Sequence, residues 1–180
     1  CIYSIYCWHF DFFGKKILNA LFNENITVNS IVIINQPLSY SYKLFKSVTK
    51  RIGLFNTLYL VSRKLFFENS QYKLLLNNKK IETKYQKLSN NIIYTKGTNS
   101  INTINTLKSI EPDIIILGQT GIIKKEIINC AKFVLNAHPG ILPKYRGIDV
   151  HKWALINEEF NKIGCTIHLV DKGVDTGNII

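Results

Sequence analysis

Short apolar runs alternate with stretches of helical periodicity along the whole of this 180-residue chain. The runs are rich in β-branched and aromatic residues, which favour strands. Between them, apolar residues recur every three to four positions, which indicates helices. The predicted strands are residues 2–10, 28–37, 91–95, 113–118, 133–138 and 165–170, and the predicted helices are residues 14–24, 40–67, 99–111, 122–132 and 150–158. This alternation predicts an α/β fold with a doubly wound, mostly parallel sheet.

The chain has the size and composition of one globular domain. Its apolar fraction is 46%, and 180 residues are enough for one core. The run at 113–118 is apolar without alternation, as expected for a strand that is buried on both faces. We therefore expect a single domain over residues 1–180. The chain lacks Met at position 1 and ends in the apolar run Asn178–Ile180, so we expect this domain to be truncated at both ends.

Basic residues outnumber acidic residues by 23 to 12, which gives a formal net charge of +11. Such a balance is compatible with an anionic partner, such as nucleic acid, a nucleotide or a phosphorylated substrate. The lysines are scattered and do not follow one face, which favours a general compositional bias. The helical stretch 40–67, with Lys and Arg between its apolar positions, is compatible with a membrane or partner surface. We nevertheless expect its apolar stripe to face the core.

The cysteines lie at positions 1, 7, 130 and 165. No two of them form a Cys-x-x-Cys pair, which argues against a zinc cluster, and a chain of this length does not need a disulfide scaffold. We therefore expect no metal site and a reducing, cytoplasmic compartment. No apolar run approaches the ~20 residues that a membrane-spanning helix needs, so we expect no membrane span.

Polar, glycine-containing segments follow three of the predicted strands. They are Gly-Gln-Thr-Gly-Ile-Ile at 118–123, Asn-Ala-His-Pro-Gly at 136–140 and Asp-Lys-Gly-Val-Asp-Thr-Gly at 171–177. In open α/β sheets, ligands bind in the crevice outside the carboxyl ends of the strands. We therefore expect these three segments to form the walls of one crevice.

Asn136 and His138 are two residues apart at the end of an extended segment, so their side chains point to the same side. A histidine can accept a proton near neutral pH, and an amide N–H can stabilise an oxyanion. The pair predicts half of an acyl-transfer site, although a histidine with a purely structural role also fits. Asp175 also fits two interpretations. It is either the carboxylate of a turn or cap, or the group that orients His138 or carries a proton through water.

Four other polar residues near these segments have weaker signals. His168 lies in the middle of a predicted strand, and we interpret it as a packing residue or as support for the site. His151 and Lys152 open a predicted helix, so we expect them at the surface. Arg146 follows turn-prone positions, where it would either contact a phosphate or carboxylate or brace the loop.

Four motifs occur in order in the second half of the chain. They are Asn-x-His-Pro at 136–139, Leu-Pro-x-Tyr-Arg-Gly at 142–147, Gly-x-Thr-x-His at 164–168 and Asp-x-Gly at 175–177. With the segment upstream of them, they make residues 92–180 resemble the 10-formyltetrahydrofolate-dependent formyltransferases. The resemblance is specific, because it rests on four motifs with suitable spacing and not on Asn-x-His alone.

The resemblance implies a Rossmann-like catalytic domain that moves a formyl group from N10 of 10-formyltetrahydrofolate to an amine, without a metal. By motif, the catalytic residues would be Asn136, His138 and Asp175. The residues that would bind the folate co-substrate are Gln119, Thr120, Gly121, Ile122 and Ile123 in one loop, with Asp171 and Val174 in the turn that closes the pocket.

The first half of the chain bears on the amine acceptor. Family members of the purine pathway carry a glycine-rich turn after the first strand that cradles a phosphate, whereas residues 9–16 here contain one glycine. Methionyl-tRNA enzymes have Phe-Phe-Gly before a helix, as at 12–14. The variant at 146–155 and the basic segment 40–67 most resemble the branch that formylates amino sugars on nucleotides.

We therefore expect a small amine acceptor, first of all a nucleotide-linked amino sugar, with methionyl-tRNA and glycinamide ribonucleotide as alternatives. Two other classes stay open. A folate-binding protein without activity would account for the unusual first half. A basic RNA-binding module would account for the charge, although the chain has no aromatic-plus-basic motif of the known RNA-binding folds.

Overall fold

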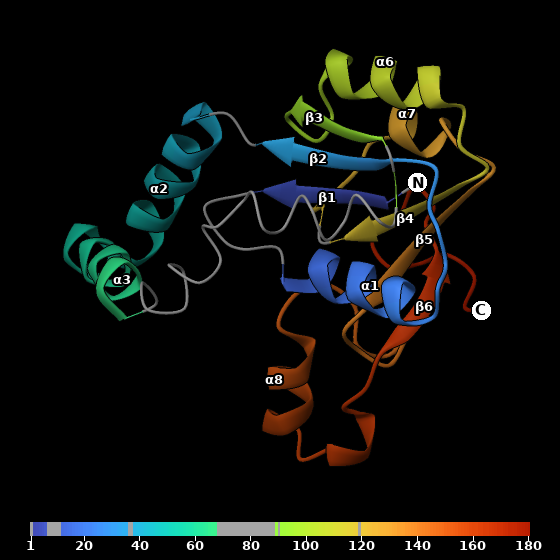
Figure 1. The fold of residues 1–180 in the computed structure, drawn as a ribbon. Helices are drawn as coiled ribbons and strands as arrows, with labels where there is room; N and C mark the ends of the chain where they lie inside the picture. Colours follow the sequence, from blue (N-terminus) through green and yellow to red (C-terminus); the bar gives the residue numbers. More distant parts are fainter. Residues whose placement is uncertain (1, 7–11, 36–37, 68–88, 90, 119) are drawn as a thin grey trace.

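The computed structural model describes residues 2–6, 12–35, 38–67, 89, 91–118 and 120–180. In this part of the chain, six strands form one sheet in the order β3-β2-β1-β4-β5-β6 (Figure 1). Strands β1 to β5 are parallel, and β6 runs antiparallel to β5. The predicted α/β fold with a mostly parallel sheet is confirmed.

The observed elements follow the predicted order. The strands are β1 (Ile2–Tyr6), β2 (Ile31–Asn35), β3 (Ile92–Lys96), β4 (Ile114–Gly118), β5 (Phe133–His138) and β6 (Thr166–Leu169). The helices are α1 (Phe12–Asn23), α2 (Leu38–Ile52), α3 (Leu54–Phe67), α6 (Ile101–Ile110), α7 (Lys125–Ile128) and α8 (Val150–Ile156), with a 3-10 turn η1 (Phe160–Lys162). The end of the first predicted strand, from residue 7, lies outside the described residues. No helix of the described part is long and apolar enough to cross a bilayer.

Two apolar clusters pack against opposite faces of the sheet, because successive residues of each strand alternate between the faces. One cluster joins α6 and α7 to the sheet through Val32, Ile34, Leu107, Ile115, Leu117, Ile127 and Val134. The other joins α1 to the opposite face through Leu18, Ile31 and Ile33. Figure 1 shows α6 and α7 on one side of the strands and α1 on the other. The sheet is therefore doubly wound, as predicted.

Strand β1 lies inside the sheet, and the chain leaves it in both directions. Strands β2 and β3 extend the sheet on one side, and β4, β5 and β6 extend it on the other. The direction changes between β1 and β4, and such a switch point leaves a crevice at the carboxyl ends of the two strands. The segment 120–123 therefore follows β4 at the edge where ligands bind in sheets of this kind.

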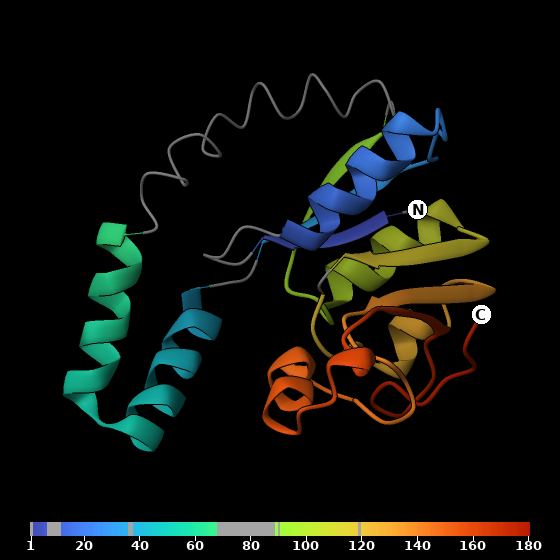
Figure 2. The ribbon, with the colours of Figure 1, turned by 90° about the horizontal axis from the view of Figure 1, so that it is seen from below.

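The helical stretch predicted at 40–67 differs from the structure in two ways. It is broken into α2 and α3 at Gly53, whose φ of +81° belongs to the left-handed region that ends helices. The expectation that its apolar stripe faces the core is wrong, because Leu58, Leu60 and Val61 of that stripe are 49%, 43% and 40% exposed. Among the described elements, α2 and α3 pack chiefly against each other. Figure 2 shows the pair standing away from the sheet.

The helix predicted at 122–132 is shorter than its periodicity indicated. Only Lys125–Ile128 is helical, and the chain then turns, with the Cys130 N–H donating to the Ile127 oxygen at 3.0 Å. Ile127 is fully buried in the core, and Ile123 and Ile128 pack against the same cluster. The helix-like spacing of apolar residues therefore arises because a loop and a single helical turn pack against the same core cluster.

Leu107 provides a test of the cluster under α6, because its side chain is fully buried. We expect Leu107→Ala to lower the free energy of unfolding by ~2–5 kcal/mol, since the lost side chain leaves a cavity. Ile101→Ala is the matched control on the same helix, because Ile101 is 67% exposed, and it should change stability by about 0.5 kcal/mol or less. Urea denaturation measures both, and equal losses would contradict the assignment of this core.

Candidate active site

The carboxyl end of β5 carries the first two predicted site residues. Val134, Asn136 and His138 alternate onto one face of the sheet, and Val134 belongs to the core cluster below α6 and α7. His138 is only 3% exposed. Polar side chains thus replace apolar ones where the strand leaves the core, and the predicted common orientation of Asn136 and His138 agrees with the structure.

His138 is fixed by the backbone of the loop that follows β5. Its Nε2 lies 2.8 Å from the Tyr145 carbonyl oxygen. A carbonyl oxygen only accepts, so Nε2 carries a proton and Nδ1 is the nitrogen that can bind another. The Tyr145 side chain anchors this loop, because its hydroxyl donates to Glu159 and accepts from Asn157 Nδ2 at 3.1 Å. Hydrogen bonds from Lys144 and Tyr145 hold the pKa of Glu159 below its ordinary value.

Asp175 faces both buried histidines of the site. Its Oδ2 lies 3.5 Å from His138 Nδ1 and accepts the Gly147 N–H at 2.8 Å. Its Oδ1 lies 3.5 Å from His168 Nε2. The side chain is 14% exposed, against 3% and 2% for the two histidines. The carboxylate therefore lies between the histidines and the surface.

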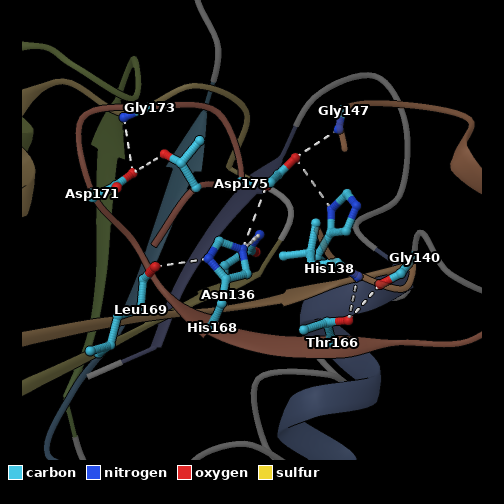
Figure 3. Close-up of polar contacts among 12 residues, drawn as sticks. Asn136, His138, Gly140, Gly147, Thr166, His168, Leu169, Asp171, Gly173 and Asp175 are labelled. Carbon is cyan, nitrogen blue, oxygen red and sulfur yellow. Dashed lines mark hydrogen bonds and ion pairs between the residues drawn. The ribbon is translucent and has the colours of Figure 1, made fainter. Parts of the chain in front are cut away.

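His168 has a larger place in the site than its position in the sequence indicated. Its Nδ1 donates to the Leu169 oxygen at 2.8 Å, which leaves Nε2 to accept from Asn136 Nδ2 at 3.2 Å (Figure 3). In the β5–β6 ladder, His168 is directly opposite Asn136. It therefore orients the amide of Asn136 and also faces Asp175. The pairing of β5 with β6 brings Asn136 and His168 together, although they are 32 positions apart in the chain. In the sequence, only the Gly-x-Thr-x-His motif indicated that His168 belongs to the site.

Asp175 reaches the site by a reversal of the chain, which corrects the prediction that three strand ends form the crevice. Because β6 is antiparallel, its last residue Leu169 pairs with Leu135, away from the carboxyl end of β5. The segment 170–177 turns back, and the Leu169 N–H then donates to the Asn178 oxygen at 2.8 Å. Strand direction is not visible in an apolar run, so the sequence could not give this arrangement.

The returning segment is braced by its own polar groups. Asp171 Oδ1 accepts from the Gly173 N–H at 2.9 Å and from the Thr176 hydroxyl at 2.6 Å. The Thr176 hydrogen bond, followed by the Gly173 N–H, holds the pKa of Asp171 below its ordinary value. A Cβ at Gly177 would lie 1.8 Å from the Leu169 oxygen, so only glycine fits there. The turn is thus shaped to present Asp175.

Thr166 joins β6 to the loop after β5. Its hydroxyl donates to the Gly140 oxygen at 2.7 Å and accepts from the Leu142 N–H at 3.1 Å. Gly140 is closely surrounded, because a Cβ there would lie 2.9 Å from the Tyr145 oxygen and 3.1 Å from His138 Nε2. The glycine thus allows the loop to approach the histidine that it fixes.

The loop after β4 is held by two residues that the sequence analysis did not select. The Thr98 hydroxyl donates to the Thr120 oxygen at 3.3 Å, and Asn99 Nδ2 donates to the Ile122 oxygen at 3.0 Å. The Asn99 side-chain oxygen accepts from the Lys124 N–H at 2.7 Å. Thr98 and Asn99 directly follow β3. Their position after a parallel strand is the sequence feature that could have identified them as part of the site.

Of the predicted folate-binding residues, the structure buries Thr120 and leaves Ile122 and Val174 exposed at 79% and 55%. Gly121 has a φ of +71°. Ile123 packs against the core cluster that also contacts Val170. Gln119 lies outside the described residues.

The other three residues with weaker signals, unlike the buried His168, lie at the surface. Arg146 and His151 are exposed. Lys152 is also exposed and pairs with Asp149, 2.8 Å away. In the described part of the chain, no group of three or more His, Cys, Asp or Glu side chains is arranged to hold a metal ion.

Residues 12–180 match the family described as formyl transferase. The chain belongs to this family. The match extends the resemblance seen in residues 92–180 across nearly the whole chain. It therefore also includes the first half, where the motifs were less clear.

Curated relatives include the methionyl-tRNA formyltransferases of Clostridium acetobutylicum, 40% identical over 87 residues, and Thermodesulfovibrio yellowstonii, 45% identical over 82 residues. These matches cover 47% and 44% of this chain but only 28% and 26% of the relatives.

Among solved structures, glycinamide ribonucleotide transformylase 1 from Symbiobacterium toebii has a TM-score of 0.56 at 17% identity. That likeness covers 99% of this chain and 69% of the other. At this identity it shows the shared fold alone, which is the Rossmann-like arrangement that the resemblance implied.

The Thr166 bridge gives a stability prediction. Thr166→Val keeps the shape but removes the hydroxyl, so the Gly140 carbonyl and the Leu142 N–H lose a partner. We expect a loss of ~1–3 kcal/mol in the free energy of unfolding, together with a shift of the His138 ring signals in NMR spectra. Thr106→Val on α6 is the control and should change neither. Stability and His138 signals that match the control would show that the bridge does not position this loop.

Proposed function

We propose that this protein transfers a formyl group from 10-formyltetrahydrofolate to a primary amine, in the cytoplasm. The observation that carries the proposal is the convergence of Asn136, His138 and Asp175. Asp175 lies 3.5 Å from His138. His168 joins Asn136 to Asp175 through contacts of 3.2 Å and 3.5 Å. The family to which the chain belongs supports the reaction type. Each of the three residues then has a distinct part in the chemistry.

His138 is the proposed acceptor of the proton that the attacking amine must lose. Its Nε2 is committed to the Tyr145 carbonyl, so Nδ1 is the basic atom, and that atom faces Asp175 Oδ2. The Asp175 carboxylate is the more exposed of the two groups. A proton would therefore pass by way of the carboxylate or a water to Nδ1, and the resulting imidazolium would be stabilised by the adjacent negative charge. When the bond between the formyl carbon and N10 breaks, this proton would pass to N10, and tetrahydrofolate would leave.

Asn136 is the proposed donor to the oxyanion that forms when the amine attacks the formyl carbon. An amide nitrogen carries two hydrogens, and the contact with His168 Nε2 uses one of them. The second is then held in a fixed direction toward the reacting carbonyl. A preorganised donor of this kind contributes ~2.7–4 kcal/mol of transition-state stabilisation.

The folate co-substrate fits the loop after β4 and the turn before Asp175. Ile122 and Val174 expose apolar side chains there, and a ring system that covers them would remove this surface from water. The hydrogen bonds from Thr98 and Asn99 fix the carbonyls of this loop. We propose that Thr120–Ile123 and Asp171–Val174, with Gln119, form the pocket. The bound folate would supply the formyl group itself.

For the acceptor, we propose a small amine, first of all an amino sugar carried on a nucleotide. Arg146 is an exposed cation next to Gly147, whose N–H binds Asp175, and a guanidinium at this place suits a phosphate-bearing acceptor. Methionyl-tRNA is the second candidate, because the curated relatives carry that name at 40–45% identity over their matched parts. Glycinamide ribonucleotide is the third.

Asp175→Asn tests the proposed proton route. The amide cannot accept a proton or stabilise an imidazolium, so we expect the transfer rate to fall by about 10²–10⁴. Asp149→Asn is the matched control, because both aspartates have left-handed φ values, 52° and 56°, which Asn also tolerates. Circular dichroism checks folding, and tetrahydrofolate release measures the rate. Wild-type turnover in Asp175→Asn would refute the role.

A panel of acceptors tests the substrate. Protein with 10-formyltetrahydrofolate is mixed with a nucleotide-linked amino sugar, glycinamide ribonucleotide or methionyl-tRNA, and tetrahydrofolate release is followed. We expect release with the amino sugar, because the phosphates of its nucleotide suit the exposed guanidinium of Arg146. Release with methionyl-tRNA alone would establish the second candidate. Folate binding without release from any acceptor would favour a binding protein without activity.

A further inference from the structure

The helical hairpin α2–α3 contributes no residue to the proposed active site. Its thirty residues, 38–67, contain six Lys or Arg and no Asp or Glu. Among the described elements, the two helices pack chiefly against each other. Both ribbon views show them standing apart from the sheet (Figures 1 and 2). The hairpin is thus a basic projection whose outer surface the described part of the chain does not cover.

Helix α3 turns its apolar side outward, which is the reverse of a helix that covers a core. Its exposed apolar residues are Leu54, Phe55, Leu58, Tyr59, Leu60 and Val61, between 40% and 90% exposed. The five other than Leu60 lie on one arc of the helix. At ~100° per residue they occupy roughly half of the helix circumference. Thr57, on the other side, is 2% exposed. Five large apolar side chains on one arc form a continuous exposed patch, which marks an interaction surface.

Helix α2 supplies the charge. Lys43, Lys46, Lys50 and Arg51 are all exposed, and the spacing of three, four and one residues places them on one side of the helix. Tyr42 beside them is 67% exposed. The hairpin therefore joins a basic helix to an apolar one through a single glycine.

We propose that the α2–α3 hairpin binds an anionic membrane surface, with the apolar arc of α3 in the interface and the cations of α2 at the lipid headgroups. Helices that lie in this interface combine Lys and Arg with Phe and Leu in the same way. Charge complementarity favours an anionic partner, since residues 38–67 contain six cations and no acidic residue. A lipid surface meets this requirement and also takes up aliphatic side chains.

Two other occupants fit less well. A second copy of the hairpin would bring like charges together, which opposes association. RNA would satisfy the cations, and Phe55 and Tyr59 could stack on bases, but Leu54, Leu58 and Val61 would then stay exposed to water. Of these three partners, the membrane accounts best for both the charge and the aliphatic character of the surface.

Vesicle sedimentation of the protein tests the proposal. We expect binding to phosphatidylcholine vesicles that contain phosphatidylglycerol, and little binding to phosphatidylcholine alone. Lys46→Gln combined with Lys50→Gln should weaken binding by about 30-fold, because each basic residue at an anionic surface contributes a factor of ~5. Phe55→Ser should weaken it by about tenfold or more.

Controls come from exposed residues elsewhere. Ile101→Ser on α6 removes an exposed apolar side chain, and Lys108→Gln with Lys132→Gln removes two exposed cations. Neither should change vesicle binding. Circular dichroism and thermal melting show whether each variant is folded. Because none of these residues has been placed in the active site, formyl transfer measured in parallel separates a failure of this proposal from a failure of the proposed reaction.

Several outcomes would overturn the proposal. They are no binding to anionic vesicles, equal binding to neutral ones, or equal effects of the hairpin and control variants. Dimerisation that Phe55→Ser abolishes would assign the surface to a second copy of the chain. RNA binding that the paired lysine variant abolishes, without vesicle binding, would assign it to nucleic acid.

Discussion

The antiparallel pairing of β5 with β6 is the constraint on which the site depends. It places Asn136 opposite His168 and His138 opposite Thr166, so two polar pairs lie side by side at the edge of an apolar core. One pair orients an amide, and the other ties the loop after β5 to β6 through the Thr166 hydroxyl. It also sends the chain back as the segment that presents Asp175. Slippage by one residue would turn each of these side chains to the other face.

Hydrogen bonding sets the protonation pattern of the site. The Tyr145 carbonyl holds the proton of His138 on Nε2, so the unprotonated Nδ1 of a neutral ring faces a carboxylate oxygen. Two acceptors at this distance repel each other, whereas a proton on Nδ1 makes the contact attractive. The Gly147 N–H partly compensates the carboxylate charge. In the proposed reaction, this arrangement would receive the proton that the attacking amine loses.

The periodicity of the sequence predicted the fold well, because alternating strands and helices leave few ways to cover both faces of a sheet. Asn136 and His138 were recognisable as partners, since they share one strand. Other features depend on long-range contacts. The direction of β6 is one such feature. The contact between Asn136 and His168 joins residues 32 positions apart, and the hydrogen bond from Thr98 to Thr120 joins residues 22 positions apart. The exposure of α3 was also hidden, because an apolar stripe has the same spacing whether it faces a core or a partner.

The two surfaces of this protein follow different physical rules. In the site, directional hydrogen bonds hold four polar side chains, those of Asn136, His138, His168 and Asp175. The proposed chemistry depends on accurate positions of these side chains. On the hairpin, apolar area and net charge are spread over two helices, and neither depends on close geometric fit. Because α2 and α3 pack chiefly against each other, substitutions on the hairpin would leave the hydrogen bonds around His138 intact. In the proposed membrane attachment, binding to lipid and transfer of the formyl group would therefore be physically separable.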